Sequence, residues 1–441
     1  MNIFLVSLGC DKNLVDSEKI LGHIHDNGYE ITMDESQADI IIINTCCFIH
    51  DAKQESVDTI LEYAEYKTHG KLKSLIVVGC LAERYKNEIM KEIPEVDALI
   101  GTSSFDKIIE IINNTIKGEK ASHFTKLDKL PLVNEKRVLN FGNFYAYLKI
   151  AEGCDKHCTY CVIPQVRGNY RSVPMDLLIK EAKALAAQGI KELILVAQET
   201  TLYGVDLYNK KALTELLRQL CKIEGISWIR ILYAYPEEIT SDLIQVIKEE
   251  PKIRKYLDIP IQHASDRILK LMGRMTSKND IKNIIKELRK NIPDIALRTS
   301  LIAGFPTETE QEHKELMDFV ESMKFERLGV FTYSKEENTP AATLKPQVHG
   351  NTKKRRQREI MELQQDIAFS RNEELVGMTT EVLIEGKVSQ EDVYIGRTYM
   401  DAPLVDGYIF INSDKDLLSG DIIKAKIIKG EGYDLIGEID E

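Results

Sequence analysis

Short, almost continuous apolar runs alternate with amphipathic stretches along residues 1–120. The apolar runs are NIFLVSLG, ADIIIINTC, KSLIVVGC and DALIG, and stretches of helical periodicity such as NLVDSEKILGHIHDNG and SFDKIIEIINNTI follow them. Apolar runs of this length between helical patterns are typical of parallel strands that are buried on both faces. The alternation therefore predicts an open parallel α/β domain over residues 1–120.

The alternation resumes at residue 145. Residues 121–144 lack clear periodicity and contain the proline and charges of a linker. Six strand-like runs, from AYLKIAEG to RLGVFTYS, then alternate with helical stretches over residues 145–371, which predicts a partial (βα)6 barrel. Over residues 372–441, five short runs separated by turn residues predict a small antiparallel β-barrel. The expected fold class is α/β with three domains.

Composition narrows the possible functions. The chain has no apolar stretch of about 18 residues and no basic segment before its first apolar run, so we expect a cytoplasmic protein with no membrane partner. Eight cysteines among 441 residues are too few for a disulfide scaffold. A net charge of −12 argues against a large non-specific nucleic-acid surface. Grouped thiols in such a protein more often serve metals or redox chemistry.

Three cysteines follow apolar runs of the first domain. Cys10, Cys46 and Cys80 each stand at the carboxyl end of a predicted strand. Ligands of open α/β sheets bind at this edge, so we expect the three thiols to converge there. A lone cysteine beside a strand is more often a buried structural residue. Three at equivalent strand ends favour a shared ligand instead.

A second group of cysteines lies on the first loop of the predicted barrel. Residues 154–161 read CDKHCTYC, and the next cysteine is Cys221. Ferredoxin-type clusters use four thiolates, and structural zinc sites usually close a tetrahedron with two separated ligand pairs. His157 as a fourth zinc ligand would strain so short a loop. Three thiolates on a four-iron cluster would leave one iron open to a substrate or cofactor.

The CxxxCxxC pattern, with Tyr160 before its last cysteine, resembles the radical S-adenosylmethionine family. The resemblance implies that Cys154, Cys158 and Cys161 hold a [4Fe-4S] cluster. The open iron of that cluster binds S-adenosylmethionine, and one electron cleaves the cofactor to a 5′-deoxyadenosyl radical. The electron would come from a donor such as flavodoxin or ferredoxin.

Nearly the whole chain resembles the methylthiotransferases of the MiaB/RimO family, because the three N-terminal cysteines and a C-terminal barrel similar to TRAM domains accompany the motif. The resemblance implies a second [4Fe-4S] cluster on Cys10, Cys46 and Cys80, where one S-adenosylmethionine methylates a sulfur from an unspecified donor. A second S-adenosylmethionine supplies the radical, which takes hydrogen from the substrate carbon that then collects the methylthio group.

Four stretches resemble the RimO branch of this family, which modifies the β-carbon of an aspartate in small-subunit ribosomal protein twelve. They are SLGCDKNLVDSE, KIAEGCDKHCTYCVIP, IPIQHASDRILKLMGR and GVFTYSKEENTPA. The MiaB branch, which modifies a tRNA adenosine, typically reads GCQMN in the first stretch. Asp11 stands where RimO usually has proline, and Cys47 stands where the family usually has glycine. Cys46 aligns with the family ligand, and whether Cys47 competes with it stays open.

Charge offers an independent test of the branch. Residues 373–441 contain sixteen Asp and Glu against six Lys and Arg, a net charge of −10. A domain that binds RNA should be basic, because it must neutralise phosphates. We therefore expect tRNA to be a poor partner and a basic ribosomal protein a better one. An acidic surface that only aids solubility explains the charge equally well. The basic run KKRRQR at 353–358 is more often a solvated helix face than an RNA site.

Polar residues at strand ends of the barrel are expected to face the same mouth and to hold the cofactor with Tyr160. They are Gln198, Glu199, Gln262, His263 and Arg298. A structural role explains any single one equally well, because such residues often satisfy backbone groups. A non-catalytic iron–sulfur electron-transfer or scaffold protein would explain two clusters. It would explain neither the six-unit barrel nor the added C-terminal domain.

Overall fold

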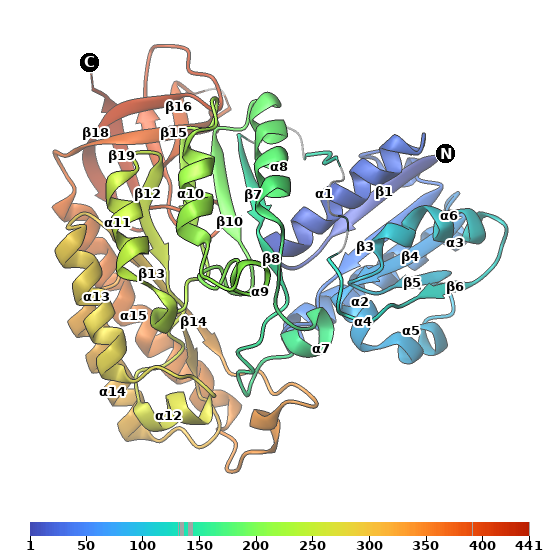
Figure 1. The fold of residues 1–441 in the computed structure, drawn as a ribbon, viewed down its shortest axis with the longest axis horizontal. Helices are drawn as coiled ribbons and strands as arrows, with labels where there is room; N and C mark the ends of the chain where they lie inside the picture. The colour runs from blue at the N-terminus through green and yellow to red at the C-terminus, as the bar shows by residue number, and fades with distance from the viewer. Residues whose placement is uncertain (131, 133–135, 140–143, 390, 441) are drawn as a thin grey trace.

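The computed structural model describes residues 1–130, 132, 136–139, 144–389 and 391–440. Figure 1 shows an N-terminal sheet, a central sheet covered by helices, and a C-terminal barrel. This arrangement confirms the expected α/β class with its three parts. None of the described helices is long and apolar enough to cross a membrane.

The N-terminal sheet has six parallel strands in the order β2-β1-β3-β4-β5-β6. The strands are β1 Asn2–Ser7, β2 Glu30–Ile31, β3 Ile40–Thr45, β4 Ser74–Gly79, β5 Ala98–Ile100 and β6 Ala121–His123. Every residue of β3 and β4 is buried, as expected for apolar runs covered on both faces. Strand β6 lies within the segment that the sequence predicts as a linker, of which residues 131, 133–135 and 140–143 lie outside the described residues.

The helices of this part follow the strands in sequence. They are α1 Asp11–Asp26, α2 His50–Ala64, α3 Tyr66–His69, α4 Cys80–Arg84, α5 Lys86–Glu92 and α6 Ile108–Ile116, with short 3-10 turns at Glu35–Gln37 and Phe105–Lys107. Helix α1 lies between the N-terminal and central sheets in Figure 1. It packs against the first central strand, and this contact joins the two domains.

The central sheet also has six parallel strands, in the order β14-β13-β12-β11-β10-β7. The strands are β7 Tyr145–Lys149, β10 Glu192–Val196, β11 Trp228–Ile231, β12 Ile253–Asp258, β13 Ala296–Ala303 and β14 Arg327–Thr332. The order follows the sequence from β7 to β14, and these two edge strands do not pair with each other in the described sheet. The partial (βα)6 barrel predicted from the alternation is confirmed.

Helices cover the outer face of this partial barrel. The longer ones are α8 Met175–Ala187, α10 Leu213–Cys221, α11 Ser241–Glu249, α13 Lys278–Asn291, α14 Glu310–Met323 and α15 Gly350–Glu374. The shorter elements are strands β8 Ala151–Glu152 and β9 Arg171–Ser172, helices α7 Ile163–Arg167, α9 Val205–Tyr208 and α12 Asp266–Leu271, and 3-10 turns at Pro236–Glu238 and Pro340–Thr343. The apolar faces of the helices and the strands form one large buried cluster.

The C-terminal domain is a closed five-stranded barrel in the order β15-β16-β17-β19-β18. Its strands are β15 Thr379–Lys387, β16 Val393–Thr398, β17 Ile409–Asn412, β18 Ile422–Glu431 and β19 Asp434–Ile439. The predicted small antiparallel β-barrel is confirmed, and one of its junctions, that of β17 with β19, is parallel. Strand direction cannot alternate at every junction around a closed ring of five, so at least one junction must be parallel.

The C-terminal barrel covers the amino ends of central strands. Arg397 pairs at 2.7 Å with Glu192, the first residue of β10, and Arg327, the first residue of β14, pairs with Asp401 at 2.5 Å. One apolar cluster joins Val15 of α1 and Tyr147 of β7 to residues of this barrel. The opposite end of the central sheet, where the strands finish, is left for the cysteine loop.

Candidate active site

Sheet order brings the three N-terminal cysteines to one edge. Cys10 precedes α1 directly, Cys46 follows β3, and Cys80 begins α4 directly after β4. Strands β1, β3 and β4 are neighbours, so their carboxyl ends lie side by side. This strand order brings the three cysteine positions to one edge of the sheet, where the sequence predicts that they meet.

Two glycines permit the close approach of these strand ends. Gly9 has φ +87°, and a Cβ placed on it would lie 2.6 Å from Cβ of Cys46 and 2.9 Å from its Sγ. Gly79 has φ +92°, and its Cβ would lie 2.3 Å from Oδ1 of Asn44. Any larger residue at either position would push the cysteine-bearing turns apart.

The three thiols influence one another electrostatically. Burial raises the pKa of Cys46 to about 12, and the thiols of Cys80 and Cys10 add to the rise. Burial also raises the pKa of Cys80, against which the nearby Arg167 guanidinium acts. The raised pKa values of Cys46 and Cys80 favour their protonated thiols, and a bound metal ion would displace these protons.

Cys47 occupies a different environment from Cys46. Its side chain is fully buried, and its Sγ donates a hydrogen bond to the backbone oxygen of Cys80 at 3.2 Å. It packs in the apolar cluster that contains Ile60 and Ile89. This contact favours a packing role for Cys47 and leaves Cys46 as the candidate ligand.

The second cysteine group lies on a loop that is closed at its base. Strand β8, which precedes the loop, pairs with β9, which follows helix α7. The backbone N–H of Cys154 donates to the oxygen of Gly168 at 3.1 Å, and that of Cys161 donates to the oxygen of Cys158 at 3.0 Å. The N–H of Ile163 points at Sγ of Cys161, 3.4 Å away. The loop is thus folded around its three sulfurs.

The thiols of this loop also share one site. Burial raises the pKa of Cys154 to about 11, with further contributions from Cys158 and Glu199. Burial raises the pKa of Cys161 as well, and the thiols of Cys158 and Cys154 add to it. Each triad is therefore a compact group of thiols, although the members of one are far apart in sequence.

Three thiolates at each site are a donor set of the kind that iron–sulfur clusters use. Within the described residues, no three His, Cys, Asp or Glu side chains surround a single metal-ion position. In a cubane each thiolate binds a different iron, so the ligands stand farther apart than around one ion. Three cysteines at each site would leave one iron of a cluster without a protein ligand.

Gln198 and Glu199 follow β10 and reach toward the cysteine loop. Nε2 of Gln198 donates to Oε1 of Glu152 at 3.1 Å. Oε1 of Glu199 accepts from the N–H of Thr201 at 2.8 Å. Among the described residues, Oε1 of Gln198 and Oε2 of Glu199 are buried without a hydrogen-bond partner. Burial raises the pKa of Glu199 to about 8. Such unsatisfied polar atoms are suited to a ligand.

Gln262 and His263 are bound into the scaffold. Gln262 has φ +70°, and its backbone bridges to β13 through the oxygen of Ser300 at 2.9 Å. His263 is fully buried, its Nδ1 accepts from the N–H of Ser265 at 2.9 Å, and its Nε2 lies 3.7 Å from Oε2 of Glu308. These contacts hold the turn after β12 in place.

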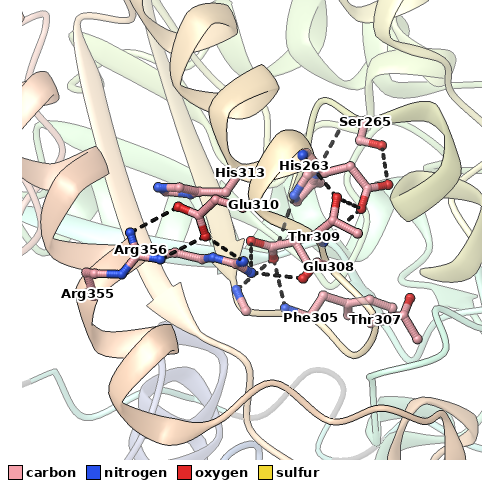
Figure 2. A network of polar contacts seen from close by, with 12 residues as sticks. His263, Ser265, Phe305, Thr307, Glu308, Thr309, Glu310, His313, Arg355 and Arg356 are labelled. Carbon is pink, nitrogen blue, oxygen red and sulfur yellow. Dashed lines mark hydrogen bonds and ion pairs between the residues drawn. The ribbon is translucent and has the colours of Figure 1, made fainter.

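Figure 2 shows Glu308 between His263 and Arg356. Its carboxylate accepts from the backbone N–H groups of Gly304 at 2.7 Å and Phe305 at 3.0 Å, and it pairs with Arg356 of α15 at 2.9 Å. This network fixes the loop after β13 against helix α15. Nε2 of His263, which is buried without a hydrogen-bond partner among the described residues, lies against this network.

Tyr160 and Arg298 are placed differently from each other. Tyr160 meets Phe305 edge-on at 6.5 Å between ring centroids, beside the cysteine loop. Arg298 pairs with Asp258 at 2.9 Å and with Asp406 of the C-terminal barrel at 3.4 Å. The charge of Arg298 is thus engaged at a domain contact, whereas the ring of Tyr160 lines the cysteine site.

Sequence reasoning missed polar residues that contact the sulfurs or the ring of Tyr235 beside them. The hydroxyl of Tyr235 lies 3.9 Å from Sγ of Cys158, and the guanidinium of Arg274 lies 4.2 Å from the centre of that ring. Nε of Arg167 lies 3.3 Å from Sγ of Cys80. Arg167 follows the cysteine loop closely in VIPQVRG, but no spacing rule connects it with Cys80.

Three family models match the chain, and with the two thiol groups they define a class. The Uncharacterized protein family UPF0004 matches residues 2–101, the Radical SAM superfamily matches residues 148–320, and the TRAM domain matches residues 376–439. The protein is a radical S-adenosylmethionine enzyme.

The particular family follows from relatives that align over the full length. The ribosomal protein uS12 methylthiotransferase RimO of Lachnoclostridium phytofermentans is 61% identical over 437 residues, 99% of each chain. The protein of the same name from Acetivibrio thermocellus is 51% identical and covers 99% of this chain and 97% of that one. The chain belongs to the RimO family of methylthiotransferases.

Solved structures share the fold of this chain. The radical S-adenosylmethionine methyltransferase TsrM from Kitasatospora setae aligns with a TM-score of 0.58 and 13% identity, covering 77% of this chain and 76% of that one. The cobalamin-dependent radical enzyme OxsB aligns with a TM-score of 0.50 and 15% identity, covering 77% and 54%. At these identities the likeness concerns the fold alone.

Proposed function

We propose that this protein transfers a methylthio group to the β-carbon of an aspartate in ribosomal protein uS12. The observation that carries the proposal is 61% identity, over 99% of both chains, to a protein named as the uS12 methylthiotransferase. Further relatives of that name are 48–51% identical over nearly the full length. The tRNA adenosine alternative is not favoured, because these relatives are named for the ribosomal protein.

The proposed enzyme holds two [4Fe-4S] clusters, one on each cysteine triad. Bound S-adenosylmethionine and the clusters supply the radical and the methylthio sulfur, with electrons from a flavodoxin- or ferredoxin-like donor. Cys154, Cys158 and Cys161 hold the cluster that binds the cleaved cofactor. The second triad holds the cluster that carries the sulfur. The apolar side chains of Phe305 and Met272 beside Tyr160 keep water from the reacting centre.

Gln198 and Glu199 are the proposed cofactor contacts at the end of β10. Their unsatisfied buried oxygens support this role, since a bound amino or hydroxyl group would satisfy them. Tyr160 contributes its ring to the same site. Gln262 and His263 hold the turn after β12 beside the site, whereas Arg298 pairs with Asp406 of the C-terminal barrel and is not a proposed cofactor contact.

The acidic C-terminal barrel is the proposed docking surface for uS12. Glu391, Asp414 and Asp416 are exposed on it, and an acidic face attracts a basic protein. Glu381 and Glu385 are less suitable docking residues, because they pair with Arg254 at 2.7 Å and with Arg397 at 2.5 Å. Docking at this domain is separate from the chemistry at the opposite end of the central strands.

Mass spectrometry of uS12 and of total tRNA, from cells with and without this gene, tests the function. We expect a methylthio mass gain on one aspartate of uS12 that depends on the gene. A gene-dependent gain in tRNA with unmodified uS12 would overturn the proposal.

Charge reversal tests the docking surface. The triple change Glu391→Lys, Asp414→Lys and Asp416→Lys should weaken uS12 binding and leave cofactor cleavage without substrate intact. A matched control makes the same charge change on the exposed face of α2, at Glu55, Asp58 and Glu62. Equal loss of binding in both variants would contradict docking at the barrel.

A further inference from the structure

A buried arginine joins the two cysteine sites. Arg167 ends helix α7, which follows the barrel cysteine loop, and it is 2% exposed. Its Nε donates a hydrogen bond to Sγ of Cys80 at 3.3 Å. A side chain from the S-adenosylmethionine domain therefore contacts a candidate iron ligand of the N-terminal domain.

The other nitrogens of Arg167 fix the direction of this contact. One terminal nitrogen donates to Asp16 at 2.7 Å and to Glu152 at 3.2 Å. The other donates to Oδ1 of Asn13 at 2.5 Å. Because the guanidinium is planar, the bonds of its two terminal nitrogens fix its orientation. Its Nε–H then points toward Sγ of Cys80.

The charges of this network balance without the cysteine. Lys149 pairs with both Asp16 and Glu152, so two cations face two carboxylates. The charges of Asp16 and Glu152 are therefore balanced by Arg167 and Lys149 alone, without any charge on Cys80. Oε1 of Glu152 accepts from Gln198, so hydrogen bonds run continuously from Cys80 to the end of β10.

We propose that Arg167 is a positioning residue for the N-terminal cluster: its Nε–H donates to the Cys80 thiolate and raises the reduction potential of that cluster. Hydrogen bonds and positive charge at the sulfurs stabilise the added electron of an iron–sulfur cluster. The inference rests on the proposed function, because it requires that Cys80 bind the second cluster. Under this proposal, the reduction potential of the N-terminal cluster depends on a residue of α7, the helix that follows the barrel cysteine loop.

The test measures the potential of the N-terminal cluster alone. Full-length protein with Cys154, Cys158 and Cys161 replaced by Ala is reconstituted anaerobically, and its reduction is followed by electron paramagnetic resonance. Arg167→Gln in this parent should shift the one-electron reduction equilibrium at least tenfold toward the oxidised form, which corresponds to about 59 mV. Arg167→Lys, which keeps the charge but not the planar donor, should give a smaller shift in the same direction.

A matched control separates this role from that of a domain clasp. Arg137 is also buried and joins α1 to α8 through Glu18 and Glu181, at 3.0 Å in the second pair. Arg137→Lys should leave the potential unchanged. Equal potentials in the parent and both Arg167 variants, with full iron content, would overturn the inference alone.

A variant that binds no iron has no measurable cluster potential, so a second variant is needed. If Arg167→Gln fails to hold iron, the potential of the Arg167→Lys variant decides: a lowered value supports the inference and an unchanged one overturns it. A parent that binds no iron overturns the second cluster, and the inference with it.

Discussion

The two cysteine triads reach a similar arrangement by opposite routes. Cys154, Cys158 and Cys161 lie within eight residues of one loop, between β8 and α7. Cys10, Cys46 and Cys80 come from the ends of three strands and meet only because β1, β3 and β4 are neighbours. The first site depends on local chain geometry and the second on correct sheet order.

The surroundings of the sulfurs differ as well. At the barrel loop, the donor to Cys161 is a backbone N–H of Ile163. At the strand ends, the donor to Cys80 is the guanidinium of Arg167, which comes from the other domain. The N-terminal site is therefore completed by a second domain, whereas the polar contacts of the loop sulfurs, from Ile163 and Tyr235, come from the central domain itself.

Removing the barrel ligands should have the largest effect. Reconstituted parent protein should bind about eight irons, and replacing Cys154, Cys158 and Cys161 together with Ala should leave about four. Cleavage of S-adenosylmethionine to 5′-deoxyadenosine should cease, because its cluster is gone. Iron analysis and product chromatography measure both outcomes, and unchanged iron content would refute the ligand assignment.

Replacing a single N-terminal ligand should affect only half of the chemistry. Cys10→Ala, Cys46→Ala or Cys80→Ala should abolish methylthio transfer to uS12, while reductive cleavage of the cofactor persists, because the radical cluster is held by another domain. Product analysis by mass spectrometry follows both reactions. Loss of cleavage in all three variants, with the barrel cluster intact, would show that the sites are not separable.

Cys47→Ala sharpens the comparison within the N-terminal site. Because Cys47 packs among apolar residues, the variant should keep about eight irons and lose on the order of 1 kcal/mol of unfolding free energy. Iron analysis and denaturant unfolding are the measurements, with Cys46→Ala as the matched comparison. Loss of iron in the Cys47 variant and its retention in the Cys46 variant would reverse the assignment.

In the apoprotein, Glu199→Gln should change the pH dependence of the unfolding free energy. Burial raises the pKa of Glu199 from 4.5 to about 8, so the folded chain keeps a proton that the unfolded chain has lost. The apoprotein therefore loses stability as pH rises through this range, by at most about 1.4 kcal/mol per pH unit.

The Glu199→Gln variant should not lose stability in this way as the pH rises. Urea unfolding of the apoprotein at several pH values checks it, with Glu224→Gln, on the surface, as the control. Identical pH profiles in parent and Glu199 variant would exclude a buried, protonated Glu199.

The sequence predicted the strands well because their signal is local. The apolar runs that became β3 and β4 are buried along their whole length, and the six runs of the barrel form its six parallel strands. The direction of β19 against β17 was not visible, because pairing joins segments distant in the chain. The linker prediction missed β6, whose three residues carry little periodicity.

For the candidate cofactor residues, too, the sequence did not show which distant segments contact each side chain. A polar residue at a strand end was predicted to face the mouth of the barrel, and this rule does not separate Gln198 from Arg298. Gln198 has an unsatisfied buried oxygen beside the loop, whereas Arg298 is engaged by Asp258 and Asp406. The distinction depends on the C-terminal domain, which supplies Asp406 from more than a hundred residues away.

The sequence by itself determined the radical S-adenosylmethionine loop, the three-part architecture and the resemblance to methylthiotransferases, because eight consecutive residues and short apolar runs carry that information. Tertiary structure decided what surrounds each sulfur. Arg167 and Cys80 are separated by 87 positions, and their contact exists only where helix α7 packs against the edge of the N-terminal sheet. A hydrogen bond between two domains depends on how they pack, and no pattern along one segment specifies that.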